Sequence, residues 1–335
     1  MSLTPIVYKS TDPGAPALTG QAGSLRDLLR AVLVTGYGSA PNVKAAAGWT
    51  EPFTGTNKAV FRNQPVAGTG GYLRIDDSST VGGSNARYAL WRMYATMSDV
   101  DTGTGVTPTS AQKTDGGLLL KSGTLDSTAR AWVIIATQRF FYLFVDLGNT
   151  ASAWTGVASF PAFFGDLISR KPGDSYHFAG ITPDVSAYTG SASNLAGMFF
   201  GNLYSSTPGT TGFLLRDYAQ ATAAKAFGLS ALSDGYTTGF IGSAGTYPDA
   251  ISGGIMVEKI MVAEGVRQIR GFLPNVYGSP NGVAFTDLQA ITDFEGVPVG
   301  TTILAKRVSQ GARTANTASN YHGMLLFDIS NNWAG

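Results

Sequence analysis

Cysteine is absent from the 335-residue sequence, which excludes both disulfide bonds and thiolate metal sites. The same absence leaves the redox compartment of the protein open. A chain of this length buries a large enough share of its surface to fold without covalent crosslinks. We therefore expect packing and hydrogen bonds alone to hold the fold together.

Charge is scarce as well. Only 13% of the residues are charged, and 23 Lys and Arg against 22 Asp and Glu give a net charge of +1. A general nucleic-acid binder needs concentrated positive charge to displace counterions from phosphates. The densest basic cluster, Lys306 and Arg307 with Arg313, is too sparse for such a groove. We expect no nucleic-acid partner.

Long uninterrupted apolar runs are also missing. The most hydrophobic stretch, ARAWVIIATQRFFYLFVDLG at residues 129–148, is interrupted at residues 137–139. The arginine there would lie at mid-span of a membrane helix, at a cost of about 3 kcal/mol. Since the N-terminus has no basic segment followed by an apolar run, we also expect no signal peptide. The sequence predicts no membrane partner.

The two halves of this stretch, residues 131–136 and 140–145, are rich in β-branched and aromatic residues, which suit a pleated strand. Two such runs around a short polar link are typical of a β-hairpin. Neither half alternates polar with apolar residues, so both faces need cover. We predict the core hairpin of a β domain.

Glycine is abundant, at 43 residues, and short candidate strands alternate with turn clusters from Trp49 onward. This spacing is typical of a sandwich or a barrel. Only one helix is clear, and Ser24 is its predicted N-cap. Its stripe needs cover from its own sheet or from a neighbouring subunit. The apolar positions of that stripe are Leu25, Leu28, Leu29, Val32 and Leu33.

These patterns predict an all-β protein in three parts. Residues 1–36 form an N-terminal arm and helix, and residues 37–264 form a β-sandwich domain. Residues 265–335 form a small C-terminal β unit, either a compact β-barrel or an added layer. Residues 216–227 fit a short helix or a loop equally well. The arm and helix are the leading candidate for inter-subunit contact, because extended arms gain order when a neighbour covers them.

No catalytic constellation stands out. The sequence has no nucleophile elbow, phosphate-binding loop or dinucleotide fingerprint, and His177 and His322 are far apart. Asp174 lies three residues before His177, but nothing marks a serine partner, so a histidine bonded to a backbone carbonyl is the better interpretation. We expect no enzyme activity, no catalytic residue and no cofactor.

Carboxylates offer one weak metal candidate. Asp99 and Asp101 in SDVDTGTG resemble the start of a calcium loop, but Ser110 stands where an EF-type loop has Glu. A turn in which Asp side chains accept nearby backbone N–H groups is favoured. The pair Asp76 and Asp77, at a strand end, is predicted to be a solvated turn.

Aromatic residues raise the question of glycan binding. Trp154, in the loop-like NTASAWTGVAS, is the tryptophan predicted to be exposed and is the candidate glycan contact. The favoured alternative places the five tryptophans in the core and in subunit interfaces.

Several strings resemble virion structural proteins of tailed bacteriophages, notably those of Pseudomonas and related Gram-negative hosts. They are LTPIVYKSTDPGAPALTGQAGSLRDLLRAVLVTGYGS, AAAGWTEPFTGTNKAVFRN, YATMSDVDTGTGVTPTSAQ, STARAWVIIATQRFFYLFV and IRGFLPNVYG. Members of this group are placed in the virion, in the tail or baseplate. The resemblance covers most of the chain but contains no catalytic motif.

What the resemblance implies is an assembly component of the virion, put together in the host bacterial cytoplasm. Its partners would be other virion proteins and further copies of itself in a ring or trimer. The resemblance implies no site residue and no cofactor. The alternative is a host-surface glycan recognition module of the tail, and a glycan-degrading enzyme is the least favoured reading.

Overall fold

The computed structural model describes residues 4–78, 87–150, 159–183, 201–202, 210–230, 257–264, 268–279, 285–292, 297–309 and 321–333. Strands make up 51% of the structure and helices 5%. The predicted all-β, sandwich-like fold is confirmed.

One sheet has five antiparallel strands in the order β2-β3-β4-β5-β8. Its strands are β2 (Thr50–Gly55), β3 (Lys58–Arg62), β4 (Tyr72–Asp76), β5 (Arg87–Tyr94) and β8 (Gly117–Ser122). A separate two-stranded hairpin, β6 (Thr96–Asp99) and β7 (Thr102–Thr104), follows β5. The hairpin covers part of the outer face of the sheet, where Val60, Tyr94 and Met97 form a small apolar cluster.

The second sheet has fourteen strands, and every neighbouring pair along its main path is antiparallel. In path order these are β1 (Ile6–Lys9), β9 (Arg130–Ala136), β10 (Phe140–Thr150), β11 (Ser159–Asp166), β13 (Phe178–Pro183), β15 (Thr210–Leu214), β16 (Ala224–Ser230), β17 (Glu258–Glu264), β18 (Gln268–Ser279), β21 (Tyr321–Asp328), β20 (Thr302–Ser309) and β19 (Ala290–Thr292). Two short strands join beside this path: β12 (Ile168–Ser169) pairs with β18, and β14 (Gly201–Asn202) pairs with β16.

The predicted core hairpin is present as β9 and β10, paired in antiparallel register with Leu143 opposite Ile134. Side chains of β10 alternate between two apolar cores, as expected for a strand with period two. Phe141 and Leu143 enter the first core, whereas Tyr142 and Phe144 enter the second. Over residues 140–147 both faces of β10 are buried. This confirms the prediction, made from its unbroken apolar sequence, that the strand is covered on both sides.

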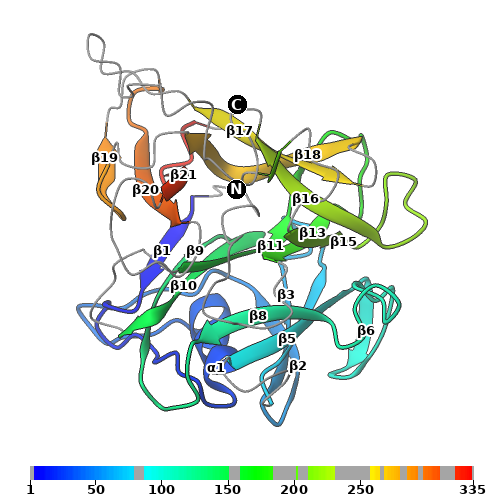
Figure 1. Cartoon of the computed structure of the whole chain (residues 1–335), viewed down its shortest axis with the longest axis horizontal. Helices are drawn as coiled ribbons and strands as arrows, with labels where there is room; N and C mark the ends of the chain where they lie inside the picture. Colours follow the sequence, from blue (N-terminus) through cyan, green and yellow to red (C-terminus); the bar gives the residue numbers. More distant parts are fainter. Residues whose placement is uncertain are drawn as a thin grey trace.

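The two cores create three layers, visible in Figure 1. The five-stranded sheet and the helix lie below β9, β10 and β11. Strands β16, β17, β18, β20 and β21 lie above them, so the large sheet folds back over its own central strands. The C-terminal strands therefore extend the large sheet as an added layer. The predicted boundary between residues 264 and 265 falls between β17 and β18, which pair directly.

The predicted helix begins at Ser24, as α1 (Ser24–Arg30), and continues as the π-helical segment η1 (Ala31–Thr35). Its five apolar positions are fully buried in the first core, so its own chain covers the stripe. Ser24 is not the N-cap, because Gly23 occupies that position and no side chain of the cap residue bonds the helix. The Leu25 amide instead donates to Asp77 Oδ2 at 2.8 Å.

The expectation that Asp77 lies in a solvated turn is wrong. Its side chain is fully buried, where it pairs with Lys121 and accepts the first amides of the helix. A carboxylate stabilises this end of a helix because unpaired N–H groups converge there. Asp76 is more exposed and pairs with Arg74 at 3.0 Å.

The N-terminal arm is ordered by its own chain. Strand β1 pairs with β9, and Tyr8 is buried in the first core. The outward edge of β1 is closed, because Val7 O accepts Lys44 Nζ at 2.9 Å and Lys9 N donates to Asp12 Oδ2 at 2.9 Å. Residues 4–36 are thus held by contacts within their own chain, and their role as an inter-subunit contact stays a prediction. The sequence of residues 216–227 fits a helix or a loop. Residues 216–223 are a loop, whereas residues 224–227 belong to β16, which neither alternative predicted.

Candidate functional site

His177 bonds a backbone carbonyl, as predicted: its Nδ1 lies 2.5 Å from Asp174 O. Its Nε2 lies 3.5 Å from Arg139 Nη2 and 3.9 Å from Asp166 Oδ2. The hydroxyl of Ser169 donates to the Asp174 carboxylate at 2.6 Å and does not face the imidazole. Asp174 and His177 are thus neighbours through the backbone, without the geometry of a catalytic triad.

The candidate calcium ligands Asp99 and Asp101 lie at the β6–β7 turn. Asp99 accepts the Val100 amide at 2.7 Å, as the turn interpretation requires. Asp101 lies between Lys58 and Arg74; although burial acts to raise its pKa, bonds from these two cations lower it. In the part of the chain that the structure describes, no three acidic or histidine side chains gather to hold a metal ion. The geometry favours the turn.

Trp154, the candidate glycan contact, lies outside the described residues. Its role therefore stays a prediction.

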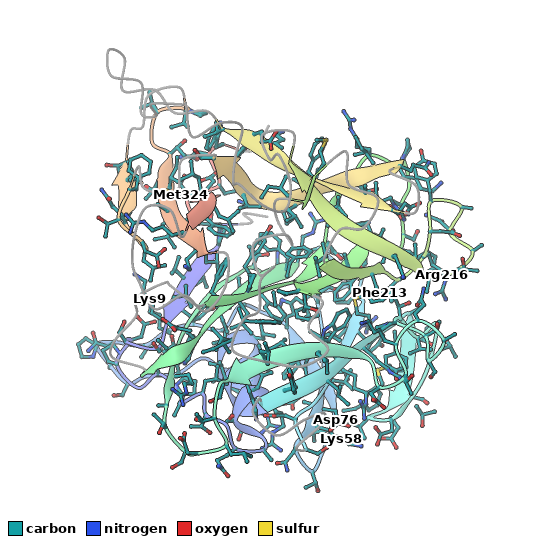
Figure 2. The ribbon with its side chains drawn as sticks, viewed as in Figure 1. Lys9, Lys58, Asp76, Phe213, Arg216 and Met324 are labelled. Atoms are coloured by element: carbon teal, nitrogen blue, oxygen red, sulfur yellow. The ribbon has the colours of Figure 1, made fainter. Side chains whose placement is uncertain are left out.

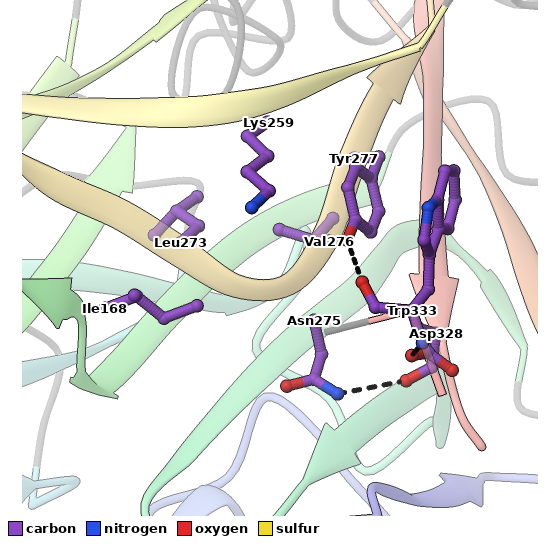
Figure 3. A pocket seen from close by; sticks show the side chains of 8 residues that line it. All are labelled: Ile168, Lys259, Leu273, Asn275, Val276, Tyr277, Asp328 and Trp333. Atoms are coloured by element: carbon purple, nitrogen blue, oxygen red, sulfur yellow. Dashed lines mark hydrogen bonds between the residues drawn. The ribbon is translucent and has the colours of Figure 1, made fainter. Parts of the chain in front are cut away.

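A pocket lies where β18 bulges away from β17. Lys259 pairs with Tyr277 and Met261 pairs with Phe272, so four residues of β18 oppose a single residue of β17. Asn275, inside the bulge, has a φ of 54°, a conformation that asparagine tolerates better than most residues. The cavity is about 30 Å³, enough for a methyl group or one or two waters. Its lining is Ile168, Lys259, Leu273, Asn275, Val276, Tyr277, Asp328 and Trp333 (Figure 3).

One wall of this bulge pocket is aromatic. The rings of Tyr277 and Trp333 stack at 3.8 Å and 20°. The Tyr277 hydroxyl donates to the Trp333 carbonyl, and the Trp333 amide donates to Asp328 Oδ2 at 2.6 Å (Figure 3). Burial raises the pKa of Tyr277 to about 12, so the hydroxyl stays a donor at neutral pH. The Tyr277 hydroxyl and the backbone of Trp333 thus fix the wall by hydrogen bonds.

Asn275 gives the bulge pocket an acceptor. Its Nδ2 donates to Asp328 O and to Asn331 Oδ1, both at 3.3 Å. These bonds turn the amide oxygen away from Asp328, on the side of Ile168 in Figure 3. Within the described ranges, no donor bonds this oxygen. The pocket can therefore accept one hydrogen bond beside an apolar floor formed by Leu273 and Val276.

A group of cations packed on aromatic rings adjoins the pocket; we call it the cation–aromatic surface. It consists of Arg170, Lys171, Arg216 and Lys259 with the rings of Phe272, Tyr218 and Tyr176. Arg170 and Lys259 share the Phe272 ring, at 5.1 and 5.7 Å from its centroid. Lys171 lies 4.6 Å from the centroid of Tyr218. Arg216, 5.4 Å from the centroid of Tyr176, marks this side of the molecule at the right of Figure 2.

Beneath this surface lies a buried ion cluster centred on Arg270. Arg270 Nε and Nη2 donate to the Asp174 carboxylate at 2.7 and 2.8 Å, and Nη1 donates to Glu264 at 2.8 Å. Burial alone would raise the pKa of Asp174, but bonds from Arg270, Ser169 and the Tyr176 amide lower it to about 2. Arg270 thus bonds both acids from inside and offsets one of their two negative charges. Among the described residues no carboxylate pairs with Arg170, Lys171 or Arg216.

Comparison with known proteins gave no match to a family model, and no curated protein matched the chain. No helix within the described ranges is long and apolar enough to cross a membrane.

Sequence reasoning missed both the bulge pocket and the cation–aromatic surface. The dipeptide Pro274–Asn275 inside an otherwise strand-like run was the available signal, because proline interrupts sheet pairing and marks bulges. The cations carried no comparable signal, since Arg170 and Lys259 are distant in sequence and meet only through Phe272.

Proposed function

We propose that this chain is a structural subunit of a bacteriophage virion, a tail or baseplate component that acts through protein–protein contacts. The observation that carries the proposal is where the phage-like strings lie in the fold. They form β1, the helix, β2 with β3, the β6–β7 hairpin, the central β9–β10 pair and part of β18. The resemblance therefore concerns the elements that build the cores and the hairpin.

Two edge strands, β1 and β2, are poorly suited to pairing with a strand of another subunit, which favours assembly contacts through faces and loops. On the outward edge of β1, the Val7 carbonyl and the Lys9 amide are already bonded by the side chains of Lys44 and Asp12. In β2, an edge strand of the five-stranded sheet, Pro52 lacks an N–H to donate. Strand addition at β1 and at β2 is therefore disfavoured. The β6–β7 hairpin is the best-placed contact, because residues 102–104 are exposed and ion pairs of Asp101 with Lys58 and Arg74 hold the turn in place.

The direct test uses a phage that encodes this chain, with a nonsense codon in its reading frame. We expect particles with absent or defective tails in a non-suppressing host, restored by the chain supplied from a plasmid. Purified normal particles should contain the chain by mass spectrometry. Complete tails that lack the protein would overturn the proposal.

The hairpin contact is tested by Thr102→Glu with Thr104→Glu, scored by complementation of the same phage. We expect an unchanged far-UV spectrum and unfolding midpoint but at least a tenfold loss of complementation. Val66→Glu with Val299→Glu adds the same charge at sites that are 82% and 95% exposed, and it should complement normally. Equal complementation by both variants would remove the hairpin from the assembly.

A further inference from the structure

The cation–aromatic surface and the bulge pocket meet. Lys259 belongs to both, and Ile168, in the pocket wall, lies two residues before Arg170 and opposite Phe272. We propose that together they bind an acidic saccharide, whose carboxylate or phosphate groups lie on the cations and whose ring substituent enters the pocket. This inference does not depend on the assembly role.

Charge favours an anion on this surface. Arg270 offsets one of the two negative charges on the nearest buried acids, Asp174 and Glu264, so the buried cluster keeps a net charge of −1 below the four cations of the surface. Among the described residues no carboxylate forms an ion pair with Arg170, Lys171 or Arg216, so the surface as a whole stays positive. Guanidinium groups donate two parallel hydrogen bonds to carboxylate or phosphate, which makes arginine the preferred ligand for either anion.

The cations are also held in place before a ligand arrives. Each packs over a ring at 4.6 to 5.7 Å, within the range of cation–π attraction. Side chains ordered in advance lose less conformational entropy on binding than free surface lysines do. The surface thus gains affinity from preorganisation without needing a large buried area.

The pocket offers a hydrogen-bond acceptor and an apolar floor, neither of which a bare anion can use. Asn275 Oδ1 accepts a hydrogen bond, so its ligand must carry a hydroxyl or an amide N–H. The floor of Leu273 and Val276 suits C–H groups, and a cavity of about 30 Å³ admits a substituent but not a whole ring. Acid groups, hydroxyls and an apolar C–H substituent occur together in acidic saccharides.

Nucleic acid fits less well, although it also carries phosphates. Single strands bind by stacking bases on aromatic faces, whereas cations already cover Phe272, Tyr218 and Tyr176. A groove that follows a nucleic-acid backbone also needs more cations than this surface provides.

The test is titration calorimetry of the full chain with two acidic probes, hexagalacturonate and a phosphorylated lipopolysaccharide core oligosaccharide. These separate carboxylate from phosphate as the anion. Maltohexaose is the neutral probe, a thymidine hexanucleotide the nucleic-acid probe, and sodium sulfate the bare anion. We expect binding of at least one acidic saccharide that weakens as salt is raised, and no binding of maltohexaose.

Two variants assign the site. Arg170→Gln with Lys171→Gln should weaken saccharide binding at least tenfold, while Lys9→Gln with Arg26→Gln removes the same charge on other elements and should change it less than twofold. Lys9 lies on the opposite side of Figure 2 from Arg216. Asn275→Asp, which keeps the left-handed backbone but adds a negative charge, should also weaken binding about tenfold.

Four outcomes would contradict saccharide binding at this site. The proposal is overturned if neither acidic probe binds, or if sulfate binds as tightly as the saccharide. It is also overturned if the hexanucleotide binds more tightly, or if the variants of the cation–aromatic surface and the control variant lose equal affinity. Unfolding midpoints of all variants, measured beside the binding, exclude misfolding as the cause.

Discussion

Two buried acid–base pairs, one below and one above the central strands, respond to burial in opposite ways. Below, Asp77 pairs with Lys121; above, Asp174 pairs with Arg270. All four side chains are at most 2% exposed. Burial dominates at Asp77 and raises its pKa despite Lys121, whereas at Asp174 the bonds outweigh burial and the pKa falls to about 2.

The difference lies in the number and geometry of donors. Asp174 accepts two bonds from the Arg270 fork and one each from Ser169, the Tyr176 amide and Gln220. Asp77 depends on one ammonium and the amides at the start of the helix. A single point charge does not replace the water that a carboxylate loses, whereas a full set of directed donors does.

The largest expected effect is that of Arg270→Met, which leaves Asp174 and Glu264 without their cation. We expect a loss of about 5 kcal/mol in the free energy of unfolding, measured by urea denaturation, because breaking a buried pair strands its partner. Arg270→Lys keeps the charge but loses the fork, so its loss should be intermediate. If Arg270→Met and Arg270→Lys both lowered the free energy of unfolding only slightly, the cluster would not be a source of stability.

Lys121→Met should cost less, about 3 kcal/mol, since it strands only one acid. The raised pKa of Asp77 already favours the neutral form, which eases its protonation once the cation is gone. The double variant Lys121→Met with Asp77→Asn should recover part of the loss in the same denaturation experiment. A loss as large as that of Arg270→Met would erase the contrast between the two pairs.

The pairs also differ in pH dependence. The lowered pKa of Asp174 adds stability above the unfolded value near 4, on the order of 2 kcal/mol, and this is lost as pH falls towards 2. Asp77, with a raised pKa, contributes in the opposite sense: its stability is present at low pH and lost as pH rises through its folded pKa. The gap between wild type and Arg270→Met should therefore narrow from pH 5 to pH 2, as shown by denaturation at each pH. A constant gap would contradict the assignment to Asp174.

The smallest effect is expected from Ser169→Ala, which removes one of the five donors to Asp174. We expect the free energy of unfolding to fall by about 1 kcal/mol and the pKa of Asp174 to rise. NMR titration of the Asp174 carboxyl carbon measures the second effect. Ser175→Ala, at an exposed position of the same turn, is the control and should change neither quantity.

Local patterns predicted the central hairpin, because its unbroken apolar run needs cover on both faces wherever it lies. The same holds for the helical stripe from Leu25 to Leu33. The cap was misassigned because Ser24 has the right chemistry locally, while the group that bonds the helix, Asp77, directly follows β4 and lies 52 residues after Leu25. Sequence spacing carries no record of such a long-range partner.

The site was less accessible to prediction. Asp174 drew notice for its distance from His177, yet its partner is Arg270, 96 residues away. An arginine in an apolar strand pattern looks like an outward-facing residue until tertiary packing closes over it. Buried charge depends on which strands become neighbours, and here the large sheet turns back on itself between β15 and β18.

The double cover of β10 has a consequence during synthesis. The upper side of this strand is completed by Phe327, whose ring packs on Tyr142 and Phe144 at 4.9 and 5.9 Å. At about 5–20 residues per second, a ribosome delivers Phe327 roughly ten to forty seconds after β10. During that interval the nascent chain exposes the strongly apolar upper face of β10. We therefore expect the yield of folded protein in cells to depend on chaperone capacity, even though the finished protein is stable.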